Sequence, residues 1–322
     1  MGLAELKKHH GDLICPRCSS SVQVDESGVR CTSTACPYSK EPFPIIAGAP
    51  ALFDFEHSIV SVEQLVATSG SSQIPREQPS SRFRRRLGTF LHPPNYQAER
   101  NIPRMLDLLR QDAGPSTRPV VLVIGGGAVG KGLDDLYAAE DVDTLAFDIY
   151  WSPVTQFIAD GHRIPLADES VDGVLIQAVL EHVLEPQVVV EQIHRVLRPD
   201  GLVYADTPFL QQVHDGPYDF TRFTDSGHRY LFRDFERIDS GTVAGAGTQL
   251  AWSIDYFFRA LFRSQMAGLG ARLVFSWLAH LDRYLDPRYS IDGASSVYFL
   301  GRKSPSRLSP QDIIGYYQGA QR

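Results

Sequence analysis

The chain has 322 residues, with 31 basic and 38 acidic side chains and a formal net charge of −7. Hydrophobic residues make up 43% of it, enough to bury a sizeable core, which excludes a largely disordered or collagen-like chain. The negative charge argues against binding nucleic acid through overall charge. No apolar run reaches the roughly 18–20 residues of a spanning helix, and the charged start lacks the apolar stretch of a secretory signal. We therefore expect a cytoplasmic protein of one or two domains.

All four cysteines lie near the start of the chain, as the pairs Cys15 with Cys18 and Cys31 with Cys36. Two close pairs can place four thiolates around one tetrahedral Zn²⁺. Two disulfides or four unbound thiols are the alternatives. Because nothing indicates secretion and no cysteine follows in the chain, we favour structural zinc.

The stretch EPFPIIAGAPALF at 41–53 follows the cysteines. Together with the cysteine pairs it resembles the zinc-ribbon modules of the Trm112-like type. Residues 1–56 are thus expected to form a small module that depends on metal for most of its stability. Residues 57–96 have linker composition, with an arginine cluster (Arg82, Arg84, Arg85 and Arg86) that is solvated or contacts an anionic surface.

Strand and helix patterns alternate over residues 97–303. A buried parallel strand is expected at 119–124, followed by a glycine-rich loop, a helix at 133–139 and a second strand that ends at Asp148. In this context the loop and the carboxylate indicate a nucleoside-cofactor site, because the carboxylate can accept hydrogen bonds from ribose hydroxyls. A dinucleotide dehydrogenase and an S-adenosylmethionine enzyme both fit this pattern.

Two later stretches favour the second class. They read ADGHRIPLADESVDGVLIQAVLEHV at 159–183 and EQIHRVLRPDGLVY at 191–204. This ordered series resembles the class I S-adenosylmethionine-dependent methyltransferases, in particular the methyltransferase-11-like group, over roughly residues 97 to 302. The resemblance implies an α/β fold with a doubly wound Rossmann-like sheet and an antiparallel final strand, here preceded by the zinc ribbon.

The resemblance also implies which residues bind S-adenosylmethionine. Asp148 would hold the ribose, and Asp160 with the backbone of Gly161 would face the adenine. Glu181 and His182 are expected to cap the following helix. Val123 stands where the family often has an acidic residue, which leaves a non-catalytic cofactor-binding protein as an alternative. The full predicted cofactor set is Gly125, Gly126, Gly127, Asp148, Ile149, Asp160, Gly161 and Gln177.

A loop with several titratable side chains, LQQVHDGPYDFTRFT, follows at 210–224. It resembles the H-x-x-P-x-D-Y-x-R-F-T stretch of methyltransferases found among glycan biosynthesis enzymes. We expect His214 to be the general base, Asp219 to orient it or a sugar hydroxyl, and Arg222 to hold Asp219 or an anionic group. The alternative is an Asp219–Arg222 pair that only fixes the loop.

The leading hypothesis is O-methylation of a sugar, a glycan precursor or another small metabolite. An rRNA base methyltransferase with a zinc-ribbon substrate module is the runner-up, opposed by the excess of acidic residues. An aromatic helical insertion at 249–285 is expected to be core or lid, with peripheral membrane contact as the alternative. Residues 304–322 are expected to form a polar tail. The acceptor and the oligomeric state do not follow from the sequence.

Overall fold

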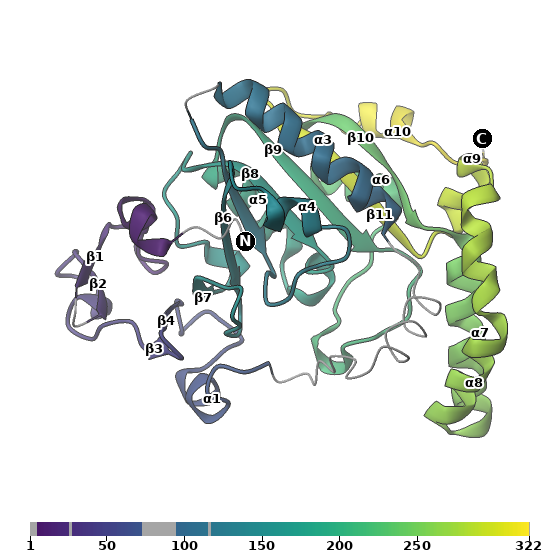
Figure 1. The fold of residues 1–322 in the computed structure, drawn as a ribbon, viewed down its shortest axis with the longest axis horizontal. Helices are drawn as coiled ribbons and strands as arrows, with labels where there is room; N and C mark the ends of the chain where they lie inside the picture. Colours follow the sequence, from purple (N-terminus) through teal and green to yellow (C-terminus); the bar gives the residue numbers. More distant parts are fainter. Residues whose placement is uncertain (1–4, 26–27, 73–94, 115–116, 322) are drawn as a thin grey trace.

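The structure is a computed structural model that describes residues 5–25, 28–72, 95–114 and 117–321. Its centre is a nine-stranded sheet in the order β10-β11-β9-β8-β5-β6-β7-β4-β3 (Figure 1). Neighbouring strands from β9 to β4 are parallel, whereas β11 is antiparallel to β9 and β10, and β3 is antiparallel to β4. This arrangement confirms the predicted α/β fold with an antiparallel final strand. The strands are β3 (Ile45–Ile46), β4 (Ala49–Leu52), β5 (Val120–Ile124), β6 (Asp143–Asp148), β7 (Phe157–Ala159), β8 (Val171–Gln177), β9 (Leu197–Pro208), β10 (Phe235–Ala244) and β11 (Ser296–Lys303).

Alternate residues of each buried strand point to opposite sides of the sheet. Because residues of both sets are apolar, helices cover both faces. In β5, Val121 and Val123 pack with α3 (Tyr96–Ala113) and α4 (Asp134–Ala138). Leu122, its neighbour in sequence, faces the other cluster, which includes α5 (Pro186–Val196) and α6 (Asp225–Leu231). The fully apolar β5 therefore lies in the middle of the protein, with its carboxyl end free to position a site.

The cysteine-bearing segment shares this sheet and core. It contains η1 (Leu6–Asp12), the antiparallel hairpin of β1 (Val22–Asp25) and β2 (Gly28–Cys31), and η2 (Pro37–Ser39). Strand β4 pairs in parallel with β7, and Leu13 bridges to Leu166. Leu13, Phe43 and Leu52 belong to the same buried cluster as β5 and β6. The predicted module is thus joined to the sheet by backbone pairing and by packing.

The segment expected to be a linker begins with helix α1 (Val62–Ala67). Ser61 and Gln64 form a capping box at its start, and Leu65 packs against Ala51 and Phe53. The helix is therefore anchored to the strand β4 region. The predicted arginine cluster lies outside the described residues.

The predicted aromatic insertion forms α7 (Ala246–Phe262), α8 (Gln265–Phe275) and the 3-10 helix η6 (Ser276–Tyr284), at the opposite end of the molecule from β1 and β2 (Figure 1). Asp282 of η6 accepts hydrogen bonds from the backbone N–H groups of Gly245, Gly247 and Thr248 at 2.7–3.1 Å and from the Thr248 hydroxyl at 2.6 Å. One carboxylate thus satisfies the start of α7.

We expect Asp282→Ala to lower the free energy of unfolding by about 2–3 kcal/mol, because several donors lose one charged acceptor. Urea denaturation measures this change. Asp286→Ala is the matched control, since Asp286 caps the short helix α9 (Pro287–Ser290) through a single bond to the Arg288 N–H. Equal losses in the two variants would contradict the role assigned to Asp282.

The chain ends in α10 (Asp312–Tyr316), within the residues expected to be a polar tail. The Tyr316 hydroxyl bonds Asp225 at 3.1 Å, and the Tyr317 hydroxyl bonds Asp292 at 2.8 Å. These contacts attach the end of the chain to the domain.

Candidate functional site

A cavity of about 1250 Å³ opens at the carboxyl ends of the parallel strands. The last residues of β5, β6, β7 and β8 line it, as does Asp206 near the end of β9. Ligands of doubly wound sheets bind at this edge, where the loops after the strands diverge. Residues of α1 and of the 3-10 helix η6 complete the wall, so segments far apart in the sequence enclose one space.

The glycine-rich loop makes a tight turn directly after β5. Gly125 has a φ of +73°, which favours glycine, and a Cβ atom there would overlap Val179. A Cβ atom on Gly127 would overlap the ring of Tyr150. The loop therefore requires glycine because neighbouring side chains pack directly on its backbone.

Asp148 is held in place by the backbone at the end of β6. It is 8% exposed, and its two carboxylate oxygens accept hydrogen bonds from the N–H groups of Gly127 at 2.9 Å and Ile149 at 2.7 Å. A carboxylate oxygen can accept more than one hydrogen bond. Asp148 lines the cavity, and a carboxylate at this place fits a ligand with neighbouring hydroxyls.

Asp160 follows β7 and is bound on both oxygens. Ser58 donates its hydroxyl to one oxygen at 2.7 Å, and His162 bonds the other through its backbone N–H and its ring Nδ1. Burial acts to raise the pKa of Asp160, but the bonds and charge of His162 outweigh it, so the pKa lies below its ordinary value. The turn that follows the cysteine-bearing segment thus contacts the cavity wall through Ser58 and Asp160, a contact that the sequence analysis did not predict.

Six of the eight predicted cofactor residues line the cavity. Gly126 and Gly127 do not line it, and a Cβ atom there would meet Ala146 and Tyr150 respectively. Those that line it are Gly125, Asp148, Ile149, Asp160, Gly161 and Gln177.

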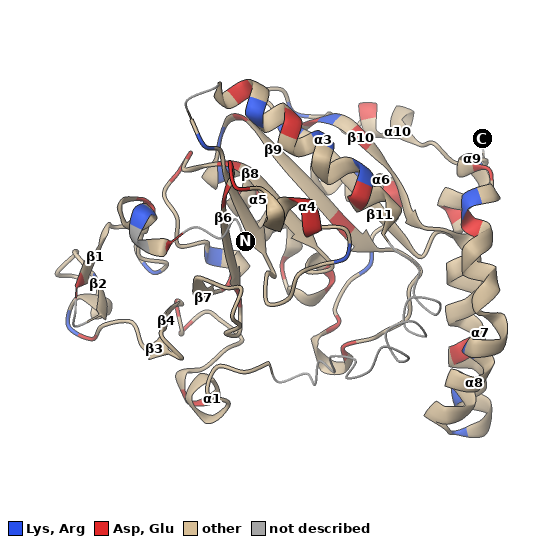
Figure 2. Ribbon diagram, viewed as in Figure 1, with Lys and Arg blue, Asp and Glu red and all other residues tan. Residues whose placement is uncertain are grey.

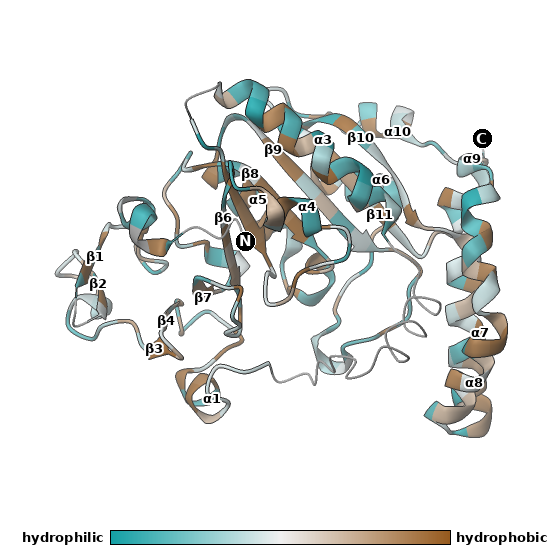
Figure 3. Ribbon diagram, in the orientation of Figure 1, coloured by the Kyte–Doolittle hydropathy of each residue, from teal (hydrophilic) through white to brown (hydrophobic). Residues whose placement is uncertain are grey.

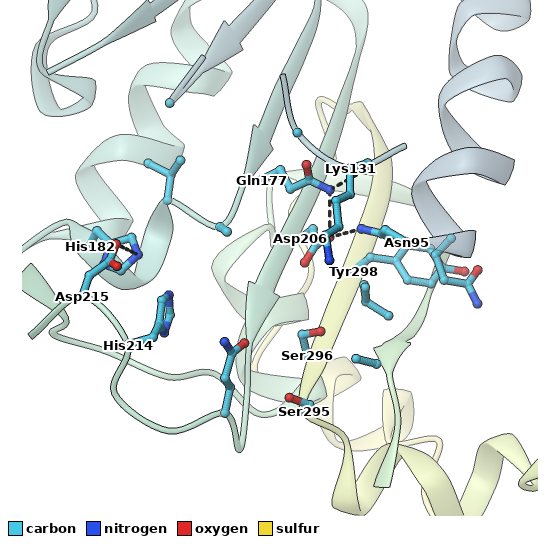
Figure 4. A pocket seen from close by; sticks show the side chains of 18 of the residues that line it. Asn95, Lys131, Gln177, His182, Asp206, His214, Asp215, Ser295, Ser296 and Tyr298 are labelled. Atoms are coloured by element: carbon cyan, nitrogen blue, oxygen red, sulfur yellow. Dashed lines mark hydrogen bonds and ion pairs between the residues drawn. The ribbon is translucent and has the colours of Figure 1, made fainter. Parts of the chain in front are cut away.

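Asp206, which the sequence analysis missed, supports Gln177 from β9. Its Oδ2 accepts hydrogen bonds from the side-chain amides of Gln177 at 3.2 Å and Asn95 at 2.7 Å (Figure 4). Burial raises the pKa of Asp206 to about 6, with these two bonds acting in the opposite direction. A buried carboxyl between two amides could not be found from one sequence, since Asn95 lies far away along the chain.

The raised pKa of Asp206 predicts a pH dependence of stability. The native state keeps this proton to a higher pH than the unfolded chain, so stability falls as the pH rises from about 4 to about 6. At about 1.4 kcal/mol per pKa unit the loss reaches about 3 kcal/mol. We expect Asp206→Asn to make the fall in this pH range smaller by up to this amount when the free energy of unfolding is measured by denaturant titration at several pH values. An identical pH profile in the variant would contradict the prediction.

A second polar group lies on the other side of the cavity (Figure 4). Glu181 and His182 form the turn η4 (Leu180–His182), and α5 begins later, after Glu185, so the expected capping role for them was wrong. His182 and His214 line the cavity, and Glu181 is fully buried beside them. Burial raises the pKa of Glu181 to about 8. The sequence Leu-Glu-His at 180–182 does not by itself show whether these residues cap a helix or form part of a cavity wall.

The predicted catalytic residues are brought together by one arginine. Arg222 pairs with Asp219 and donates to the backbone carbonyls of Gln211 at 2.9 Å and Gln212 at 3.2 Å. Asp219 accepts from the backbone N–H of His214 at 3.0 Å, and its carboxylate lies 3.4 Å from the ring Nδ1. The trio therefore fixes the loop that carries His214.

The four cysteine sulfurs lie within 4.8 Å of one another. The Sγ atoms of Cys15 and Cys36 are 3.8 Å apart, and those of Cys18 and Cys31 are 3.4 Å apart. Disulfide sulfurs lie about 2.05 Å apart, so the disulfide alternative is not formed. Bonds of about 2.3 Å to a tetrahedral zinc ion place sulfurs about 3.8 Å apart. The cluster fits one such ion.

The α7–α8 pair of the insertion, which was expected to be core or lid, leaves several large apolar side chains in solvent. Phe257, Leu261, Phe262 and Met266 are 59–74% exposed. Figure 3 shows these helices as largely hydrophobic, and Figure 2 shows few charged residues on them. Within the described residues no helix is both long and apolar enough to cross a membrane.

Comparison with known proteins agrees with this geometry. Residues 137–205 match the methyltransferase domain family, which confirms the prediction of an S-adenosylmethionine-dependent methyltransferase. No curated protein matches the chain.

Several solved structures resemble the fold at low identity. Burkholderia thailandensis 1,6-didemethyltoxoflavin-N1-methyltransferase is 15% identical over 73% of this chain and 97% of its own, with a TM-score of 0.37. A complex of the Haloferax volcanii Trm112 methyltransferase activator with a methyltransferase matches at 17% identity over 64% and 90%, with a TM-score of 0.38. Haemonchus contortus phosphoethanolamine N-methyltransferase 2 matches at 15% over 63% and 52%, with a TM-score of 0.39. Likenesses this distant indicate neither a substrate nor a partner.

Proposed function

We propose that the protein transfers the methyl group of S-adenosylmethionine to a hydroxyl oxygen of a sugar, a glycan precursor or another small metabolite. The observation that carries this proposal is that Asp148 and His214 line one cavity from opposite sets of elements. A methyl donor and an acceptor must meet in one enclosed space for an in-line displacement. The bound cofactor supplies an electrophilic methyl group, and the chain supplies alignment and exclusion of water.

The cradle after β5 and β6 supports the cofactor part of the proposal. Asp148 would accept hydrogen bonds from the ribose, and Ile149, which is 37% exposed at the rim, would pack against the base. Asp160 is already bound by Ser58 and His162, so the backbone of Gly161 would make the polar contact with adenine. The general-base role of His214 stays a prediction. In the structure its Nε2 lies 3.9 Å from Oε1 of Glu181.

Incubation with isotopically labelled methyl donor tests the reaction. Purified protein is given separate pools of small metabolites, glycan precursors and RNA, and the labelled product is identified. Label in a hydroxyl of a small molecule or glycan supports the proposal. Label in RNA would favour the rRNA base methyltransferase, and cofactor binding without label in any pool would favour a non-catalytic binding protein.

We infer that the four-cysteine cluster binds a structural zinc ion, as in the zinc ribbons that the sequence resembles. The sulfur separations support a single tetrahedral ion. Because β4 belongs to this module and Ser58 follows it, the ion would stabilise one wall of the cavity as well as the hairpin.

We further infer that the exposed face of α7 and α8 contacts a membrane surface and so brings the enzyme to lipid-linked acceptors. Aromatic and aliphatic side chains with arginines at their border are typical of interfacial helices. Arg263 ends α7 beside the exposed Phe262. Sedimentation with anionic vesicles tests this inference, with Phe257→Ser and Phe262→Ser expected to reduce binding; unchanged binding would contradict it.

A further inference from the structure

Three potential metal ligands converge beside the cavity. The Nε2 atoms of His182 and His214 lie 3.7 Å and 3.9 Å from Oε1 of Glu181. All three ligand atoms lie within 4.8 Å of one another. Ligands at about 2.0–2.1 Å from a tetrahedral ion are about 3.4 Å apart, so the two histidine–glutamate distances are within about 0.5 Å of that spacing.

The histidine rings are oriented so that their Nε2 atoms face carboxylate oxygens and their Nδ1 atoms face the loop. Nδ1 of His182 lies 2.7 Å from the carbonyl of Tyr218, and Nδ1 of His214 lies 3.3 Å from the carbonyl of Gln212. A carbonyl only accepts, so Nδ1 carries the hydrogen in both rings. In its neutral form each ring then has a lone pair on Nε2, the atom that lies near Oε1 of Glu181. Histidine ligands of metal ions are typically fixed by such a bond from the second nitrogen.

Glu181 supplies an independent observation. Its side chain is fully buried, and neither carboxylate oxygen has a hydrogen-bond partner among the described residues. Its backbone carbonyl binds the N–H of Phe220 at 2.8 Å, so the loop carrying His214 is tied to the turn carrying Glu181. A buried acceptor group without a donor calls for a cation nearby.

Asp215 adds a second carboxylate to the same place. Its Oδ2 lies 3.2 Å from Nε2 of His182, and Figure 4 shows the pair beside His214. The carboxyl groups of Glu181 and Asp215 thus both face Nε2 of His182, where a cation would be within reach of both. The nearby Arg222 is engaged by Asp219 and by loop carbonyls.

We propose that Glu181, His182 and His214 bind a divalent transition-metal ion, with Asp215 or water completing its coordination. Two imidazoles and one carboxylate suit zinc, iron, cobalt or nickel better than magnesium or calcium. This assigns His214 the role of a ligand in place of a general base. The site is distinct from the four-cysteine cluster, which offers only sulfur ligands.

The consequence for the reaction rests on the proposed function. An acceptor hydroxyl bound to the ion would have a lowered pKa, and its proton would pass to water in the cavity. The acceptor oxygen would then form a bond to the methyl carbon as the carbon–sulfur bond breaks. The electron pair of that bond goes to sulfur, which leaves S-adenosylhomocysteine. No oxidant or reductant is needed.

Cobalt titration of the full chain tests the site. The cysteine cluster is first filled with one equivalent of Zn²⁺ per chain, excess metal is removed, and Co²⁺ is then added while visible absorption is recorded. We expect one Co²⁺ per chain with d–d bands and without thiolate charge transfer. His214→Ala and Glu181→Gln should each weaken this binding at least tenfold while circular dichroism and cofactor binding stay unchanged.

The matched control is His57→Ala. His57 belongs to another group of potential ligands, which also contains Asp54 and Glu56. Both of these carboxylates already pair with Arg17. This variant should bind Co²⁺ like the wild type. Absence of Co²⁺ binding outside the cysteine cluster, or binding unchanged in His214→Ala, would overturn the proposal. The cobalt titration contains no methyl acceptor, so it tests the metal site independently of methyl transfer. Cobalt binding together with no label in any pool of the labelling experiment would contradict the proposed function alone.

Discussion

Replacing Asp148 with asparagine is expected to weaken S-adenosylmethionine binding by about 10- to 100-fold. Both oxygens of Asp148 accept backbone N–H groups, from Gly127 and Ile149. An amide has only one oxygen, so its NH₂ group would face one of these donors. The variant also loses the charge that strengthens bonds to ribose hydroxyls. Loss of one charged hydrogen bond is worth about 1.5–3 kcal/mol, which corresponds to this range of affinity. Isothermal titration calorimetry with the cofactor measures it.

Asp172→Asn is the matched control for this change. Asp172 also accepts a backbone N–H, from Val120 at 2.8 Å, and pairs with Arg198 at 2.6 Å, but near the start of β8, away from the cavity. This variant should lose comparable stability without losing cofactor affinity. Equal affinity in Asp148→Asn and the wild type would show that the cofactor lies elsewhere. Equal loss in the two variants would mean that unfolding, and not the ribose contact, explains the effect.

Local patterns predicted much of the fold. The apolar run at 119–124 became β5 because every one of its side chains is buried between two helical layers. The glycine-rich loop and Asp148 were correctly expected at the same sheet edge, since carboxyl ends of parallel strands meet there. Pairing of β4 with β7 could not be predicted, because two short strands about a hundred residues apart carry no pattern that selects each other.

The second half of the site depended on tertiary contacts. His214, Asp219 and Arg222 were predicted from a loop rich in titratable groups and from its resemblance to a methyltransferase stretch. Neither shows that Arg222 binds loop carbonyls or that Asp219 accepts the backbone N–H of His214. Glu181 was assigned to a helix end because a short polar pair before a helix usually lies there. Its burial results from the loop at 210–224 folding over η4, which no local pattern records.

Removal of zinc is expected to lower both stability and cofactor affinity. Apparent binding energies of structural zinc are about 10–16 kcal/mol, as large as the whole stability of many domains, so the cysteine module should unfold without metal. Leu13, Phe43 and Leu52 would leave the central cluster, and β7 would lose its partner β4. Ser58 would no longer hold Asp160, and α1 would no longer close the cavity.

Cys31→Ser tests this coupling, because Cys31 is buried at the end of β2 where the thiolates meet. We expect loss of bound zinc, a melting temperature lower by several degrees, faster amide hydrogen exchange in β7 and at least tenfold weaker cofactor binding. Thr34→Ala, at an exposed position of the same loop, should change none of these. A metal-free variant that binds cofactor normally would mean that the module and the cavity are energetically independent. We expect zinc binding and cofactor binding to be coupled, because the strand after the cysteines extends the sheet and the next turn supplies the cavity wall.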